Sequence, residues 1–99
     1  MLVKVTDVRI VLLRRPSNGH VAFVSFIIDG QIAVDGIALY TSPPSKSGYR
    51  LVWPAKKLPN GRMVEFLYPM SAEVGEEITQ IIADEYEKLM NNWVRVELH

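Results

Sequence analysis

The most basic part of this chain is the segment 50–62, whose sequence is RLVWPAKKLPNGR. Its cations are Arg50, Lys56, Lys57 and Arg62, and Lys46 lies just upstream. There is no aspartate or glutamate between residues 36 and 64. Cations without neighbouring carboxylates can neutralise phosphates, so the segment is a candidate site for a nucleic acid. A pair of solvated lysines beside a turn is the alternative that remains open.

The same segment contains residues typical of a tight turn. Pro59 fixes a φ that suits the start of a turn, and Asn60 and Gly61 tolerate a positive φ. We therefore expect the chain to reverse there. The two lysines would precede the turn and the arginine would follow it, so that all three lie on one exposed finger.

Residues that could do covalent or metal chemistry are sparse. The chain has no cysteine, which excludes disulfides and thiol catalysis, and its two histidines are His20 and His99. No metal-binding histidine pair, phosphate-binding glycine loop or nucleophile elbow occurs. Asp84 and Glu85 are adjacent on an expected helix, where only one of them can face a given site. We predict no enzyme activity, cofactor, metal site or small-molecule substrate.

The formal net charge is zero, but the charges are divided along the chain. Residues 1–64 hold nine basic and three acidic side chains, which gives a net charge of +6. Residues 65–99 hold two basic and eight acidic side chains, which gives a net charge of −6. This division favours a molecule with a positive and a negative side, and an anionic partner for the former. An ordinary surface with uneven charges is the other interpretation.

With 99 residues the chain is expected to form one domain, residues 1–99, with a small core that self-association would enlarge. The longest apolar run, residues 21–28, is far shorter than the ~20 residues of a membrane helix. The N-terminus does not resemble a signal peptide. We therefore expect a cytoplasmic protein without a membrane span.

Alternation of apolar and polar residues predicts the strands. Gly36 lies inside the third of them, where we favour a bulge over a second hairpin turn. Asp29-Gly30 is typical of a type I′ hairpin. The expected strands are 2–13, 20–29, 31–41, 49–53 and 62–68, the last returning to the main sheet, with turns or loops at 14–19 and 41–48.

A helix is predicted from Ala72 to about Asn91, because Ser71 is a suitable N-cap and an apolar stripe follows helical spacing. Residues 93–98 alternate and are expected to add a short edge strand or to lie along a partner. The fold class is therefore α+β, a mainly antiparallel sheet of about five strands with one C-terminal helix. Tyr49, Trp53 and Tyr68 are candidates either for stacking on bases or for the core.

Several segments resemble, in order and nearly without gaps, the stage V sporulation protein G family of bacterial septation proteins. They are residues 5–9 (VTDVR), 25–29 (SFIID), 32–37 (IAVDGI) and 54–61 (PAKKLPNG), followed by Pro69 and by Glu85-Tyr86. The resemblance covers roughly residues 3–90. This chain departs from the family at Ala55, Lys57 and Leu58, where the family has Ser, Arg and Thr, and it lacks the family's Asn/Gly-rich loop and acidic tail.

The resemblance implies a homodimer of α+β subunits that binds DNA, and in some members RNA, as a regulator linked to septation and sporulation. By position, it places nucleic-acid contacts at Lys56 and Lys57, and proximity adds Arg50, Arg62 and Lys46. Lysine is a point charge, whereas arginine makes bidentate contacts, so a base contact made by the family's arginine does not carry over to Lys57 by position alone. The alternative is a non-catalytic interaction module of the division machinery that uses the acidic face of the helix.

Overall fold

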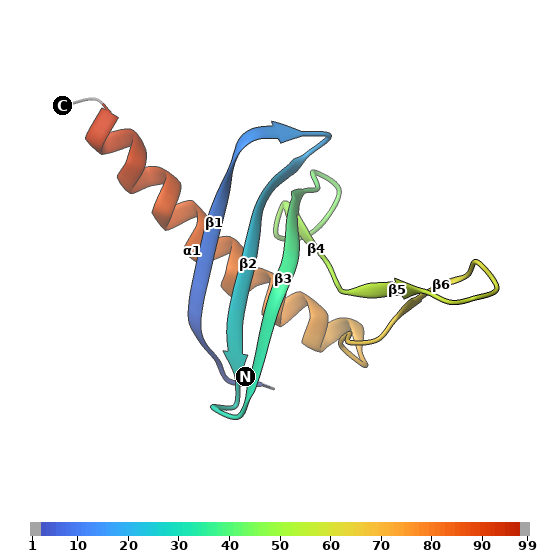
Figure 1. Ribbon diagram of the computed structural model, residues 1–99. Coiled ribbons are helices and arrows are strands. Elements are labelled where there is room, and N and C mark those ends of the chain that lie inside the picture. The colour runs from blue at the N-terminus through green and yellow to red at the C-terminus, as the bar shows by residue number, and fades with distance from the viewer. Residues whose placement is uncertain (1–2, 98–99) are drawn as a thin grey trace.

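The computed structural model describes residues 3–97 and confirms an α+β fold with a mainly antiparallel sheet and one C-terminal helix (Figure 1). Four strands form the main sheet, in the order β1-β2-β3-β4, and two short strands form a separate hairpin. The elements are β1 (Val5–Ser17), β2 (His20–Ile28), β3 (Ile32–Thr41), β4 (Tyr49–Val52), β5 (Ala55–Lys57), β6 (Met63–Glu65) and α1 (Ala72–Glu97).

Two tight turns connect the first three strands. Asp29 and Gly30 have φ values of 52° and 67°, as a type I′ turn requires, which confirms the predicted hairpin. The turn between β1 and β2 uses Asn18 and Gly19 in the same way, with φ values of 54° and 84°. β1 therefore extends to Ser17 rather than ending at residue 13. Pro16 is tolerated because β1 is an edge strand.

A bulge at Asp35-Gly36 interrupts the pairing of β2 with β3. Val24 pairs with Ile37 and Phe26 with Val34, so two residues of β3 lie opposite one residue of β2. Gly36 has a φ of 70°, which a side chain would disfavour. The predicted bulge is confirmed, and the alternative hairpin is excluded. A second bulge, which we did not predict, lies at Asp7 of β1, whose φ is 54°.

The core lies between one face of the sheet and α1. Its buried residues come from the two central strands and the helix: Ala22, Val24, Phe26, Val34, Ile37, Leu39, Ile78 and Ile82. In the described part of the chain, β2 is covered only on the side that faces the helix. On the other face, here called the outer face, the exposed fractions of Val11, Phe23 and Val52 are 64%, 41% and 40%.

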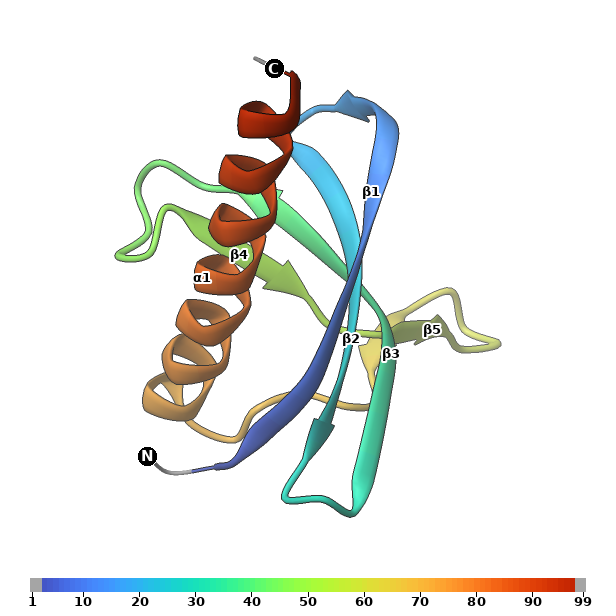
Figure 2. The same cartoon turned by 90° about the vertical axis from the view of Figure 1, so that its left-hand side faces the viewer.

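Helix α1 begins with the predicted cap and packs its apolar stripe along the sheet (Figure 2). The Ser71 Oγ accepts a hydrogen bond from the Val74 N–H at 3.2 Å. The predicted end near Asn91 is wrong, since the helix continues to Glu97. Asn91 and Asn92, the expected stop, lie inside the helix, and no glycine or proline follows Gly75 to break it. The predicted edge strand over 93–98 is therefore wrong for 93–97, and residue 98 lies outside the described residues.

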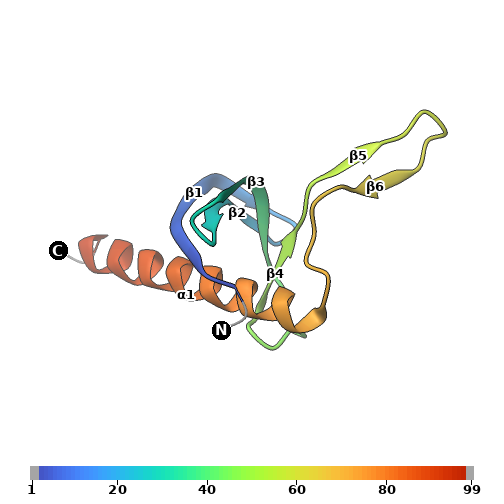
Figure 3. The same cartoon turned by 90° about the horizontal axis from the view of Figure 1, so that it is seen from below.

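The predicted strand 62–68 does not join the main sheet. Only Met63–Glu65 of it form a strand, β6, which pairs only with β5, and residues 54–66 project from the body as a two-stranded ribbon, here called the arm (Figures 1 and 3). Pro54 ends β4, so β5 starts outside the sheet, and the local turn then pairs β6 with β5. Figures 2 and 3 show the arm pointing away from α1, on the side of the outer face.

Candidate functional site

The tip of the arm is a well-defined turn. The Leu58 C=O accepts a hydrogen bond from the Gly61 N–H at 2.9 Å, and the Leu58 N–H donates to the Arg62 C=O at 2.8 Å. Gly61 has a φ of 87°. The Asn60 Oδ1 accepts from the Arg62 N–H at 3.0 Å. These bonds confirm the predicted reversal and fix the direction in which the flanking cations leave the backbone.

The two lysines of the arm point to opposite faces of it. Lys56 pairs with Val64, and Lys57 pairs with Met63. Because successive side chains of a strand alternate between faces, Lys56 shares its face with Val64 and, after the closing Leu58–Arg62 pair, with Arg62. We call this the Lys56 face. The predicted finger exists, but its cations are not all on one surface.

Charge differs between these two faces. The Lys56 face carries two cations, Lys56 and Arg62. On the Lys57 face, Glu65 pairs with Ala55 and is therefore a diagonal neighbour of Lys57. All four charged side chains are exposed, and within the described residues no ion pair involves the arm. The net charge is thus about +2 on one face and zero on the other.

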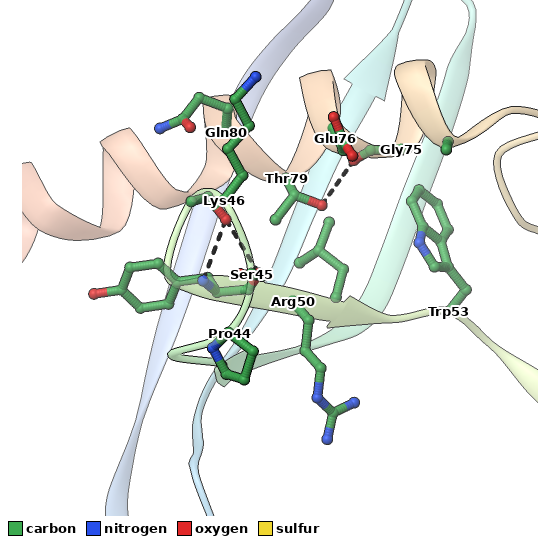
Figure 4. A pocket seen from close by; sticks show the side chains of 13 residues that line it. Pro44, Ser45, Lys46, Arg50, Trp53, Gly75, Glu76, Thr79 and Gln80 are labelled. Carbon is green, nitrogen blue, oxygen red and sulfur yellow. Dashed lines mark hydrogen bonds between the residues drawn. The ribbon is translucent and has the colours of Figure 1, made fainter.

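Arg50 lies on the main sheet rather than on the arm. Its guanidinium stands 4.4 Å from the centre of the Tyr40 ring, whose other contact is a stacked His20 ring at 4.7 Å. Both Tyr40 and Arg50 belong to the outer face, because they are directly paired across β3 and β4. Figure 4 shows the Arg50 side chain pointing away from α1. Arg50 therefore forms a cation–π contact, separate from the arm.

Lys46 is placed on a third surface. It lines a cavity of about 500 Å³ between the 44–47 loop, β4 and the first turns of α1 (Figure 4). In this loop the Ser45 and Ser47 hydroxyls donate to the Tyr49 C=O at 2.7 and 3.1 Å, and Ser47 Oγ accepts from the Tyr49 N–H at 3.2 Å. Of the five predicted cations, the structure brings together three on the arm and separates Arg50 and Lys46 from them.

Two of the three candidate stacking aromatics belong to the core. The Trp53 ring packs edge-on against Phe26 at 6.2 Å, and the Tyr49 ring against Tyr86 at 5.5 Å. Burial, and secondarily the Glu87 carboxylate, raise the pKa of both tyrosines above the usual 10.0. Tyr49 and Trp53 are therefore not placed to stack on bases. Tyr68 is 51% exposed.

Sequence reasoning missed Glu65 as a neighbour of Lys57. The two residues are eight positions apart in the chain, and the carboxylate-free stretch ends just before Glu65. Counting outward from the turn over residues 59–61 would have paired Lys57 with Met63 and placed Glu65 on the same face.

A family model described as SpoVG matches residues 3–88. The chain belongs to the SpoVG family. A relative from Clostridium perfringens, named as a septation protein SpoVG, is 31% identical over 88% of this chain and 92% of its own length. A relative of the same name from Caldanaerobacter subterraneus is 28% identical over 90% of this chain and 93% of its own length. These names describe septation proteins, not enzymes.

Two other kinds of site are absent from the described residues. None of the described helices has the length and apolar character needed to cross a bilayer. Between residues 3 and 97, no group of three or more histidine, cysteine, aspartate or glutamate side chains is arranged to hold a metal ion.

Proposed function

We propose that this protein binds nucleic acid through its arm and acts as a regulator. The observation that supports this proposal is a projecting two-stranded ribbon with three exposed cations, none of which is engaged in an ion pair within the described chain. Cations that are not neutralised by the protein are available to phosphates, and binding them releases counterions from the nucleic acid.

The shape of the arm suits this role. A two-stranded antiparallel ribbon fits the major groove of B-form DNA, where phosphates line both sides. The arm presents cations on both of its faces, and its tip carries Leu58 and Pro59 rather than carboxylates. Contacts of this kind position the protein on a duplex without reading its sequence. We therefore favour duplex DNA as the partner, with RNA as the second possibility that the binding assay distinguishes.

A biological context for this binding comes from the relatives. They carry the name septation protein, and we propose that this chain likewise acts as a cytoplasmic regulator in septation or sporulation. Regulators of this kind need no active site, and the arm supplies a binding surface rather than a catalytic one.

The test is a fluorescence-anisotropy titration of a labelled duplex and labelled single strands of DNA and RNA, at low and at physiological salt. The wild type is expected to bind more weakly as salt rises, and Lys56→Glu/Lys57→Glu is expected to lose binding. The double charge neutralisation Glu76→Gln/Asp84→Asn on α1 serves as a control and should retain it. Failure of the wild type to bind any probe at low salt would overturn the proposal.

A second function is supported by the exposed acidic side chains of α1, which include Glu73, Glu76, Asp84 and Glu87. In this alternative the helix binds a protein of the division machinery and the arm does not bind nucleic acid. The same variants separate the two functions, because Lys56→Glu/Lys57→Glu would leave binding to such a partner intact.

A further inference from the structure

The free edge of β4 has one open pair of backbone groups. In an antiparallel ladder, residues that bond the neighbouring strand alternate with residues whose N–H and C=O point away from it. The Ser42 N–H donates to the Gly48 C=O at 2.7 Å, which fixes the phase of this alternation beside β4. With the register of β3 and β4, Tyr49 and Leu51 therefore point outward. The loop serines bond the outward groups of Tyr49, whereas those of Leu51 have no hydrogen-bond partner within residues 3–97.

A cavity lies on the helix side of this open edge. It is the cavity of about 500 Å³ between β4, the 44–47 loop and the first turns of α1 (Figure 4). Leu51 and Trp53 line it from the sheet. Gly75 and Thr79 line it from α1, and Figure 4 shows Thr79 pointing toward β4 and Trp53 pointing toward α1. Its volume falls within the range of about 300–1,000 Å³ that is typical of ligand pockets.

The open backbone pair and the cavity select the same kind of ligand. An N–H and a C=O that point in one direction are matched by the C=O and N–H of one residue in an extended peptide, as in strand addition to a sheet edge. Paired residues of neighbouring strands share a face, so the peptide residue opposite Leu51 directs its side chain to the helix side, where the cavity lies. The Thr79 hydroxyl already donates to the Gly75 C=O at 2.7 Å, and Leu51 and Trp53 are apolar. The cavity therefore suits a large apolar side chain.

Charge adds a second requirement for the ligand. Every charged residue of α1 before Lys88 is acidic, and Glu76 lines the cavity. No ion pair of Glu76 occurs among the residues that the structure describes. Lys46 lines the cavity from the loop that precedes β4. A peptide that lies along α1 is thus favoured by a basic residue beside its apolar anchor, on the side away from the loop.

We propose that the groove between β4 and α1, here called the β4 groove, binds an extended peptide segment of a partner protein. The segment adds a strand at Leu51, places one large apolar side chain in the cavity and presents a basic residue to Glu76. This inference gives the protein a peptide-binding surface separate from the arm. It does not rest on the binding of nucleic acid.

The experiment is an anisotropy measurement of the full chain with a positional-scanning library of fluorescein-labelled octapeptides. One position is expected to select a large apolar residue, and a neighbouring position is expected to select lysine or arginine. In the best peptide, N-methylation of the apolar residue should weaken binding about 10-fold or more, because it removes the N–H that bonds the Leu51 C=O. N-methylation of either adjacent residue should have little effect, because those N–H groups point away from β4.

Variants of α1 test the cavity itself. Thr79→Phe fills it and should weaken peptide binding about 10-fold or more. The matched control is Leu89→Phe, which introduces the same side chain at an exposed position of α1 outside the cavity and should leave the affinity unchanged. Glu76→Gln should reduce the preference for the basic residue. Circular dichroism checks that each variant folds, and the N-methylation comparison uses the unaltered protein, so it stands even where Thr79→Phe does not fold.

Three results would count against the β4 groove as a peptide site. The first is a library in which no position selects an apolar residue. The second is equal loss of affinity on N-methylation at the anchor and at its neighbours. The third is self-association that Thr79→Phe abolishes, which would make a second copy the occupant. Lys56→Glu/Lys57→Glu should bind the peptide as the wild type does, so failure of this proposal is distinguishable from failure of the proposed function.

Discussion

The two adjacent lysines of the arm should differ in their contribution to nucleic-acid binding. Lys56 shares its face with Arg62, whereas Lys57 has Glu65 as a diagonal neighbour. A phosphate near Lys56 meets two cations, and a phosphate near Lys57 meets a cation and a carboxylate. We therefore expect Lys56→Gln to weaken binding clearly more than Lys57→Gln, although both variants remove the same charge.

Counterion release sets the magnitude. Each phosphate contact with duplex DNA contributes about 0.9 to the slope of log affinity against log salt. Lys56→Gln should lower the absolute slope by about that amount. When salt rises from about 50 to about 200 mM, the factor by which duplex affinity falls should then be about 3.5 times larger for the wild type than for this variant. Lys57→Gln should change the slope less than half as much.

The assay is an anisotropy titration of one labelled duplex at four salt concentrations. Arg62→Gln is the positive control, because it removes the second cation of the Lys56 face. Glu65→Gln tests whether the carboxylate neutralises Lys57. It should raise the affinity for the duplex when it is made in the wild type, but not when it is combined with Lys57→Gln. Equal slopes for Lys56→Gln and Lys57→Gln would refute the argument from the two faces.

Three further predictions concern stability. Ile82→Ala should lower the free energy of unfolding, measured by urea titration, by about 2–5 kcal/mol, because Ile82 is fully buried. Ile81 is only half-buried, so Ile81→Ala should lower it less. Equal effects of the two substitutions would contradict the packing described. Ser71→Ala should cost about 1 kcal/mol in the same assay through loss of the N-cap, and an unchanged midpoint would show that the cap contributes nothing. The pKa of Tyr49 is raised in the folded state, which means that folding favours the neutral phenol. The neutral phenol therefore contributes its full share to the stability of the fold below the ordinary pKa of 10.0. This contribution is lost as the pH rises through the folded-state pKa. Melting temperatures measured from about pH 9 to about pH 11 should fall, and should fall less in Tyr49→Phe; identical pH profiles would count against this cause.

Features that depend on local chemistry could be predicted from the sequence. Asp29-Gly30 and the turn over residues 59–61 adopt the conformations that their residue types favour, and Gly36 forms a bulge. Ser71 caps the helix. In each case a few neighbouring residues decide the backbone conformation, so no knowledge of the rest of the fold is needed.

Features that depend on which segments meet could not be predicted in the same way. The alternation of residues 62–68 suits a strand in any sheet, and nothing local says that β6 pairs only with β5. The alternation of residues 93–97 suits a strand as well, but a helix without a stop residue continued through them. The separation of Arg50 from the arm likewise depends on the position of β4 in the sheet.

The hydroxyls of Ser45 and Ser47 also restrict how the sheet can grow. β4 is an edge strand, and an uncapped edge strand is a template for adding further strands without limit. Both loop serines bond the outward-facing carbonyl of Tyr49, and Ser47 also bonds its N–H, so this end of the edge has no free backbone groups to offer. At Tyr49, an additional strand would therefore have to displace the loop serines before it could pair with β4.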